Sequence, residues 1–200
     1  METLQQLTTK FWHEKALPGA CGLESYLSIP NLSPAFDGLW RENGYMHQAY
    51  HLLQAWVERI FPGKNIVNHS GELHGRTPTL CYTIAGTAPG NVLIYGHYDK
   101  QPPGMGWKNN RDPFTASREG DRLYGRGAAD DGYALFGALS ALLALKAQNV
   151  PHKRAVVVIE ASEESGSPDL PFYMDALAER IGKVSLVVCL DSGCGDYERL

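Results

Sequence analysis

The sequence lacks three features that would each point to a particular class of protein. Its four cysteines form no CxxC pair and no regular spacing, which argues against a disulfide framework and a structural zinc knuckle. The formal net charge is −4, so there is no positive excess to bind nucleic-acid phosphates. No stretch approaches the roughly 18 apolar residues of a membrane span, and the N-terminus has no secretory h-region. We therefore expect a cytoplasmic protein with free, at least partly buried thiols that binds neither nucleic acid nor membranes.

Strand and helix patterns alternate after about residue 65, which is typical of an α/β sheet. An amphipathic apolar stripe precedes them and predicts a helix over 45–60. The stretch from Gln101 to Asp121 is rich in Pro, Gly, Asn and Asp and predicts a long loop, which in a compact domain is usually functional. The other predicted elements are strands at 65–67, 79–85, 91–95, 154–160 and 184–190, a buried helix opened by Asp130, and a helix over 168–181 capped by Ser167.

Side chains that can bind a metal follow three of the predicted strands, and one more opens the buried helix. In open α/β sheets the ligand crevice lies at the carboxyl ends of the strands, so these side chains are expected to meet at one edge. One imidazole with several carboxylates suits Zn²⁺ or Mn²⁺. The residues are His97, Asp99, Asp130, Glu163, Glu164 and Asp191.

Each of these residues also has a purely structural interpretation. Asp99 and Asp191 could cap turns, and Asp130 could be a helix N-cap. Glu163 and Glu164 could be solvated loop charges. A metal site would be absent only if every one of these residues had its purely structural role, although all of them are expected at one edge of the same sheet. Other catalytic signatures are missing, since the chain contains no GxxxxGK[ST], GxSxG or HExxH motif.

Five ordered motifs resemble the two-zinc aminoacylase, carboxypeptidase and dipeptidase superfamily, the M20 metallopeptidases. The HYD-x-QP form is most similar to the cytosolic nonspecific dipeptidase and carnosinase branch. The sequence departs from that branch at Gly132 and Tyr133, where the branch has Lys-Gly. The motifs are GHYDKQPP from residue 96, DPF at 112–114, LYGRGAADDG at 123–132, IEASEESGS at 159–167, and Asp191 after the last strand.

The resemblance implies an α/β three-layer sandwich, in which a mixed, largely parallel central sheet carries helices on both faces and is incomplete at the C-terminus. Residues 1–200 would be the N-terminal part of a metallopeptidase catalytic domain. A lid and dimerisation domain would be absent, as would a C-terminal catalytic segment with a further His ligand. The full-length form would be a homodimer through that missing domain.

The resemblance also implies two divalent metal ions, Zn²⁺ first, with Mn²⁺ and Co²⁺ as alternatives. His97 and Asp191 would bind one ion, Glu164 the other, and Asp130 would bridge the two. The peptide bond after Asp130 is cis in the family. We therefore expect these four side chains to converge on one cleft.

The implied catalytic residues are Asp99, which would clamp the His97 imidazole, and Glu163, which would be the general base. The implied reaction is metal-assisted hydrolysis of an amide bond in a dipeptide or at a C-terminal residue. Two alternatives stay open: an N-acyl amino acid deacylase, and a truncated, non-catalytic fragment that at most binds metal. Because a ligand and the lid are missing, we expect the 200-residue chain alone to be nearly inactive.

Overall fold

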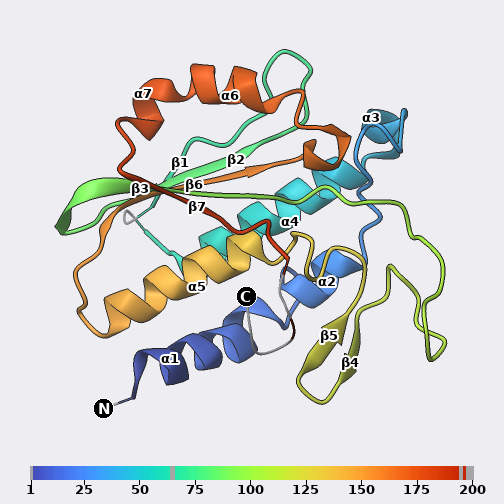
Figure 1. The fold of residues 1–200 in the computed structure, drawn as a ribbon, viewed down its shortest axis with the longest axis horizontal. Helices are drawn as coiled ribbons and strands as arrows, with labels where there is room; N and C mark the ends of the chain where they lie inside the picture. The colour runs from blue at the N-terminus through green and yellow to red at the C-terminus, as the bar shows by residue number, and fades with distance from the viewer. Residues whose placement is uncertain (1, 64–65, 194–195, 197–200) are drawn as a thin grey trace.

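A five-stranded mixed sheet forms the centre of the computed structural model, which describes residues 2–63, 66–193 and 196 (Figure 1). In spatial order the strands are β1 (Ile66–Asn68), β2 (Leu80–Ile84), β6 (Lys153–Glu160), β3 (Ala88–His97) and β7 (Leu186–Cys189). Strand β2 pairs antiparallel with β1 and β6, whereas β3 pairs parallel with β6 on one side and β7 on the other. The expected mixed sheet is therefore confirmed, with its parallel pairings around β3.

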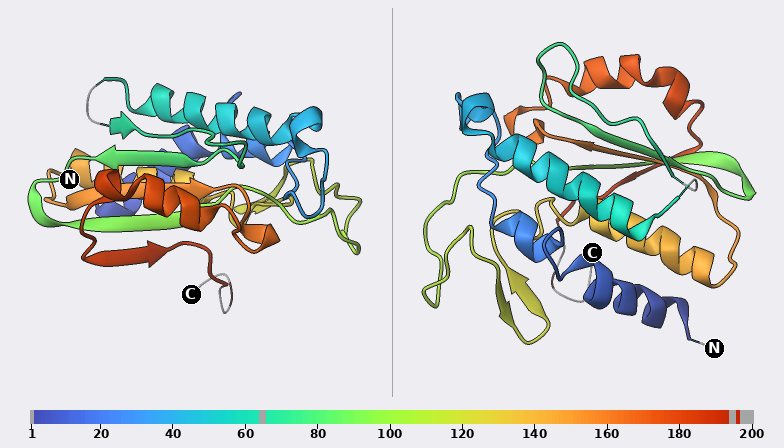
Figure 2. Two further views of the ribbon diagram at one scale, coloured as in Figure 1. Left: turned by 90° about the horizontal axis from the view of Figure 1, so that it is seen from above. Right: turned by 180° about the vertical axis from the view of Figure 1, so that it is seen from behind.

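Helices cover both faces of this sheet (Figure 2). Alternate residues of a strand point to opposite faces, and β6 follows this rule along its buried length. Its odd-numbered residues from 155 to 159 pack with α4 (Tyr45–Ile60) and α5 (Ala134–Ala147). Its even-numbered residues 156 and 158 pack with α6 (Leu170–Ala176) and α7 (Ala178–Ile181). The three-layer arrangement expected from the sequence is present.

Most of the remaining elements lie on the side of the sheet that carries α4 and α5. Helix α1 (Leu4–Phe11) continues into a π-helical turn (Trp12–Ala16), and both pack against α5. Two short helices follow, α2 (Leu23–Leu27) and α3 (Trp40–Asn43). A small antiparallel hairpin of β4 (Ser117–Glu119) and β5 (Arg122–Tyr124) projects beyond the main sheet (Figure 1).

The helix predicted over 45–60 is confirmed, but other predicted boundaries need correction. The strand predicted over 91–95 extends from Ala88 to His97, so His97 is its last residue, and the strand predicted over 184–190 is limited to Leu186–Cys189. The long loop ends earlier than predicted, since β4 occupies its last residues. The buried helix begins at Ala134 rather than Asp130, after a series of turns. The helix predicted over 168–181 begins at Leu170 and is interrupted at Leu177. Ser167 does not cap it, because its backbone has φ +54° and its hydroxyl donates to Glu160.

The thiols are free in the described part of the chain, as expected, but they differ in burial. Cys81 is buried, Cys21 is half-buried, and Cys189 is exposed, which contradicts the expectation of burial for that residue. Cys194 and the first residue of the predicted strand, Asn65, lie outside the described residues. Among the helices described, none has the length and apolar character needed to cross a membrane.

Candidate metal centre

The last residue of β3 and the extended segment that follows it present alternate side chains to opposite sides. His97 and Asp99 point to one side, with the His97 Nδ1 atom 3.3 Å from Asp99 Oδ1. Gln101 follows on the same side and donates a hydrogen bond from Nε2 to Glu164 Oε2. Tyr98 and Lys100 point the other way and are buried. Every second residue of this segment therefore faces the candidate site.

Tyr98 and Lys100 fix the segment to α2. The carbonyl oxygen of Tyr98 accepts a hydrogen bond from the Tyr26 hydroxyl at 2.5 Å. The Lys100 ammonium group is fully buried and lies 4.1 Å from the centre of the Tyr26 ring. Its three donors match three backbone acceptors around the C-terminus of α2, at distances of 2.7 to 3.3 Å: the carbonyl oxygens of Tyr26, Leu27 and Ile29.

Replacing Lys100 with Met is expected to lower the free energy of unfolding by about 3 kcal/mol, because carbonyl groups would stay buried without their charged donor. Urea unfolding followed by circular dichroism measures the loss. Lys146→Met is the matched control, since Lys146 is exposed on α5 and is expected to tolerate the same change. A loss below about 0.5 kcal/mol at Lys100 would contradict its anchoring role.

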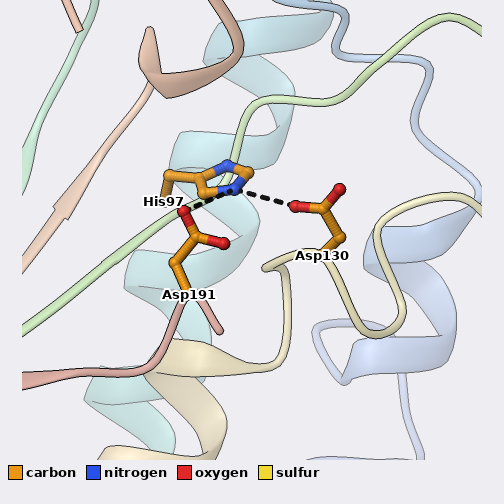
Figure 3. A group of neighbouring side chains, drawn as sticks. All are labelled: His97, Asp130 and Asp191. Carbon is orange, nitrogen blue, oxygen red and sulfur yellow. Dashed lines mark hydrogen bonds and ion pairs between the residues drawn. The ribbon is translucent and has the colours of Figure 1, made fainter. Parts of the chain in front are cut away.

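Carboxylates from three other segments surround the His97 imidazole. Figure 3 shows two of them, Asp130 and Asp191. The Nε2 atom lies 3.1 Å from Asp130 Oδ1, 3.8 Å from Glu163 Oε2 and 3.9 Å from Asp191 Oδ2. Asp130 comes from the turns before α5, Glu163 follows β6, and Asp191 follows β7. The imidazole has no exposed surface, whereas the three carboxylate side chains are 28 to 55% exposed. The cluster therefore opens to solvent on its carboxylate side.

Asp99 connects the imidazole to the turn that carries the two glutamates. This turn is the 3₁₀ helix Glu163–Ser165. The backbone N–H groups of Glu163 and Glu164 donate to Asp99 Oδ1 and Oδ2, both at 3.1 Å. The backbone carbonyl oxygen of Asp99 accepts from His97 Nδ1 at 3.0 Å. Holding Nδ1 in this way leaves Nε2 as the nitrogen that faces the carboxylates.

All six predicted site residues therefore lie in one cluster. Two groups of candidate ligand atoms, each within 4.8 Å of one another, share His97. One group contains Asp130 and Asp191, and the other contains Glu163 and Glu164. The peptide bond between Asp130 and Asp131 is cis, as the family resemblance implies.

The side chains perturb one another's ionisation in the way that crowded carboxylates do. Burial lowers the pKa of His97, but hydrogen bonds with Asp130 and Asp99 outweigh it and raise the pKa to about 11. The hydrogen bond from His97 lowers the pKa of Asp130. Burial, together with the charge of Asp130, raises the pKa of Glu164 to about 7 despite the hydrogen bond from Gln101. A divalent cation would neutralise this concentration of negative charge.

The donor set fits such a cation. An imidazole nitrogen and several carboxylate oxygens are ligands that Zn²⁺ and Mn²⁺ accept. Glu164 Oε1 is buried and has no hydrogen-bond partner among the described residues. A buried, unpaired carboxylate oxygen is costly unless a ligand satisfies it, so this atom marks a place for the metal.

Comparison with known proteins identifies the family. The family model described as peptidase family M20/M25/M40 matches residues 93–196, just over half of the 200-residue chain. The chain belongs to this family. All six clustered residues fall within the matched region, and the resemblance noted in the sequence is confirmed.

Two curated relatives of this chain carry names that imply different substrates. A probable di- and tripeptidase of Saccharomyces cerevisiae is 34% identical over 143 residues, which cover 70% of this chain and 16% of the relative. A succinyl-diaminopimelate desuccinylase of Gluconobacter oxydans is 41% identical over 92 residues, which cover 45% of this chain and 23% of that protein. This M20 chain therefore spans less than a quarter of either relative.

Solved structures support the fold. An M20 family metallo-carboxypeptidase of Sulfolobus solfataricus superposes with a TM-score of 0.71 and 27% identity, over 86% of this chain and 37% of that chain. Human carnosine dipeptidase 1 gives a TM-score of 0.67 at 21% identity, over 94% of this chain and 40% of that chain. The three-layer sandwich therefore corresponds to part of the fold of these structures.

Two residues of this M20 site escape the strand-end argument. Gln101 was predicted only as the start of a loop, although its spacing of four from His97 along an extended segment places it on the same side. Asp131 is buried, and its Oδ2 accepts the backbone N–H of His97 at 3.1 Å. A Cβ on Gly96 would lie 2.5 Å from that oxygen, so only glycine permits this contact. The sequence feature that could have indicated Asp131 is its position directly after Asp130.

Proposed function

We propose that this protein is the N-terminal part of the catalytic domain of a two-metal peptidase that hydrolyses the amide bond of a dipeptide or of a C-terminal residue. The observation that carries the proposal is the cluster of one buried imidazole and four carboxylates at the carboxyl edge of the sheet. Membership of the M20 family supports peptide or amide bonds as the target.

In this proposal a lid and dimerisation domain and a C-terminal catalytic segment lie outside these 200 residues, and the complete protein is a homodimer through the former. The coverage of the relatives supports this, since the chain spans about 40% of the solved structures. Leu186 and Val187 on the edge strand β7 are 52% and 57% exposed, which is compatible with further chain covering that edge.

The metal ligands in this proposal are His97 and Asp191 for one ion, Glu164 for the other, and Asp130 between them. Zn²⁺ is the favoured ion, and Mn²⁺ and Co²⁺ suit the same oxygen and nitrogen donors. Bound there, the ions would lower the pKa of a water molecule and polarise the scissile carbonyl group.

Glu163 is the proposed general base, which would take a proton from the attacking water and return it to the leaving amine. Burial raises the pKa of Glu163, as proton transfer near neutral pH requires. Its carboxylate is 32% exposed, so a substrate can reach it. Asp99 holds both the imidazole and the turn that carries Glu163, which fixes the distance between base and ligand.

Hydrolysis by the complete natural protein that contains these 200 residues is expected to stop after dialysis against a chelator and to return on addition of Zn²⁺. A panel of dipeptides and N-acyl amino acids then identifies the substrate class by kcat/KM. Higher values for N-succinyl or N-acetyl amino acids would favour the deacylase alternative, which the Gluconobacter oxydans relative supports. Absence of metal-dependent hydrolysis would favour the non-catalytic alternative. Robust turnover by the 200 residues alone would contradict our expectation that they are nearly inactive.

A further inference from the structure

We propose that Gln101 is a positioning residue that makes Glu164 bind metal through a single oxygen atom, Oε1. This inference rests on the proposed function, because it assigns a role toward one of the two ions. It concerns a side chain that would itself touch no metal and no substrate.

The two oxygens of Glu164 have different surroundings. Oε2 accepts the hydrogen bond from Gln101 Nε2. Oε1 is buried and has no hydrogen-bond partner within the described part of the chain. A carboxylate with both oxygens available can chelate one ion through both of them. With Oε2 held by an amide, Oε1 is the oxygen left to face the cation.

The backbone of Glu164 is fixed from the same direction. Its N–H group donates to Asp99 Oδ2 at 3.1 Å. Asp99 and Gln101 alternate on one side of the segment that Tyr98 and Lys100 fasten to α2. A single anchored segment therefore holds both the main chain and the carboxylate of Glu164, which limits the movement of the ligand oxygen.

An amide is well suited to this task because it donates a hydrogen bond without bringing a positive charge. A Lys or Arg at position 101 would compete electrostatically with a divalent cation for the same carboxylate. Gln101 leaves the full charge of Glu164 available to the ion and only restricts its orientation. Replacing an outer-shell partner of this kind typically lowers metal affinity by about 10- to 100-fold.

The test uses the complete natural protein that contains these 200 residues, with Gln101→Ala and Gln101→Glu as variants. Zn²⁺ affinity is measured by competition with a chromophoric chelator, and bound Co²⁺ is followed by its visible absorption, which reports coordination. Gln101→Ala is expected to weaken one of the two sites by about tenfold or more and to change the Co²⁺ spectrum. Gln101→Glu is expected to weaken it further, because its carboxylate would repel Glu164. Gln48→Ala, an exposed change on α4, is the matched control.

The outcomes separate the inference from the proposed function. Two-ion binding by the unmodified protein with unchanged affinities and spectra in both variants would overturn the role of Gln101 and leave the function standing. Failure of the unmodified protein to bind divalent ions would overturn both. Loss of the native circular dichroism spectrum in both variants would show that Gln101 is needed for folding, and would also overturn the positioning role.

Discussion

Glu163→Gln is expected to lower kcat by about 10³-fold while leaving metal affinity unchanged. The amide keeps the shape of the side chain but cannot take a proton from water, and general acid–base catalysis contributes about 10²- to 10⁴-fold. Steady-state kinetics on the preferred substrate measures the rate. Elemental analysis of the purified protein measures the metal content.

This substitution also distinguishes the two roles that the geometry allows for Glu163. Its carboxylate lies within 4.8 Å of ligand atoms of His97 and Glu164, so it could itself bind an ion. Loss of metal together with activity in Glu163→Gln would make it a ligand rather than the base. Glu164→Gln is expected to lose metal, and Glu58→Gln, an exposed change on α4, is expected to alter neither quantity.

His97→Ala is expected to raise the Kd for Zn²⁺ by more than about 100-fold, a larger effect than that of replacing an outer-shell partner. His97 is the residue that both groups of candidate ligand atoms share, and it is the imidazole around which the carboxylates gather. Isothermal titration calorimetry with Zn²⁺ measures the change.

The matched control for this histidine is His51→Ala, because His51 is exposed on α4 and lies in a different part of the chain. It is expected to bind Zn²⁺ with the affinity of the unmodified protein. Wild-type affinity in His97→Ala would mean that the ion binds elsewhere, and the proposed assignment of ligands would then be wrong.

The elements that the sequence predicts well are those whose pattern is long and local. The helix over 45–60 has four turns of apolar periodicity, and its predicted limits agree with α4. The β4–β5 hairpin has strands of three residues each, none of them buried and without apolar alternation, so periodicity could not reveal it. Ser167 illustrates a third case, since its positive φ and its hydrogen bond to Glu160, seven residues earlier at the end of β6, are not predicted by the preference of serine for helix N-caps.

The candidate site was predictable to the extent that topology alone assembles it. Strand ends bring His97, Glu163 and Asp191 to one edge, and a general rule about parallel strands suffices for that. The side-chain contacts within the cluster were not predictable in this way. Gln101 meets Glu164, 63 positions later in the chain, and only the folded arrangement shows that its amide reaches that carboxylate.

The alternation along residues 97–101 has a consequence for how this protein can change during evolution. A substitution at one of these positions alters the contacts of that side chain only, but inserting or deleting a single residue would shift the register of the whole segment. The side that carries His97 and Asp99 would then exchange places with the side that carries Tyr98 and Lys100. An imidazole would be pressed toward α2 while an ammonium group entered the carboxylate cluster. The number of residues from His97 to Gln101 is therefore as constrained as their identity.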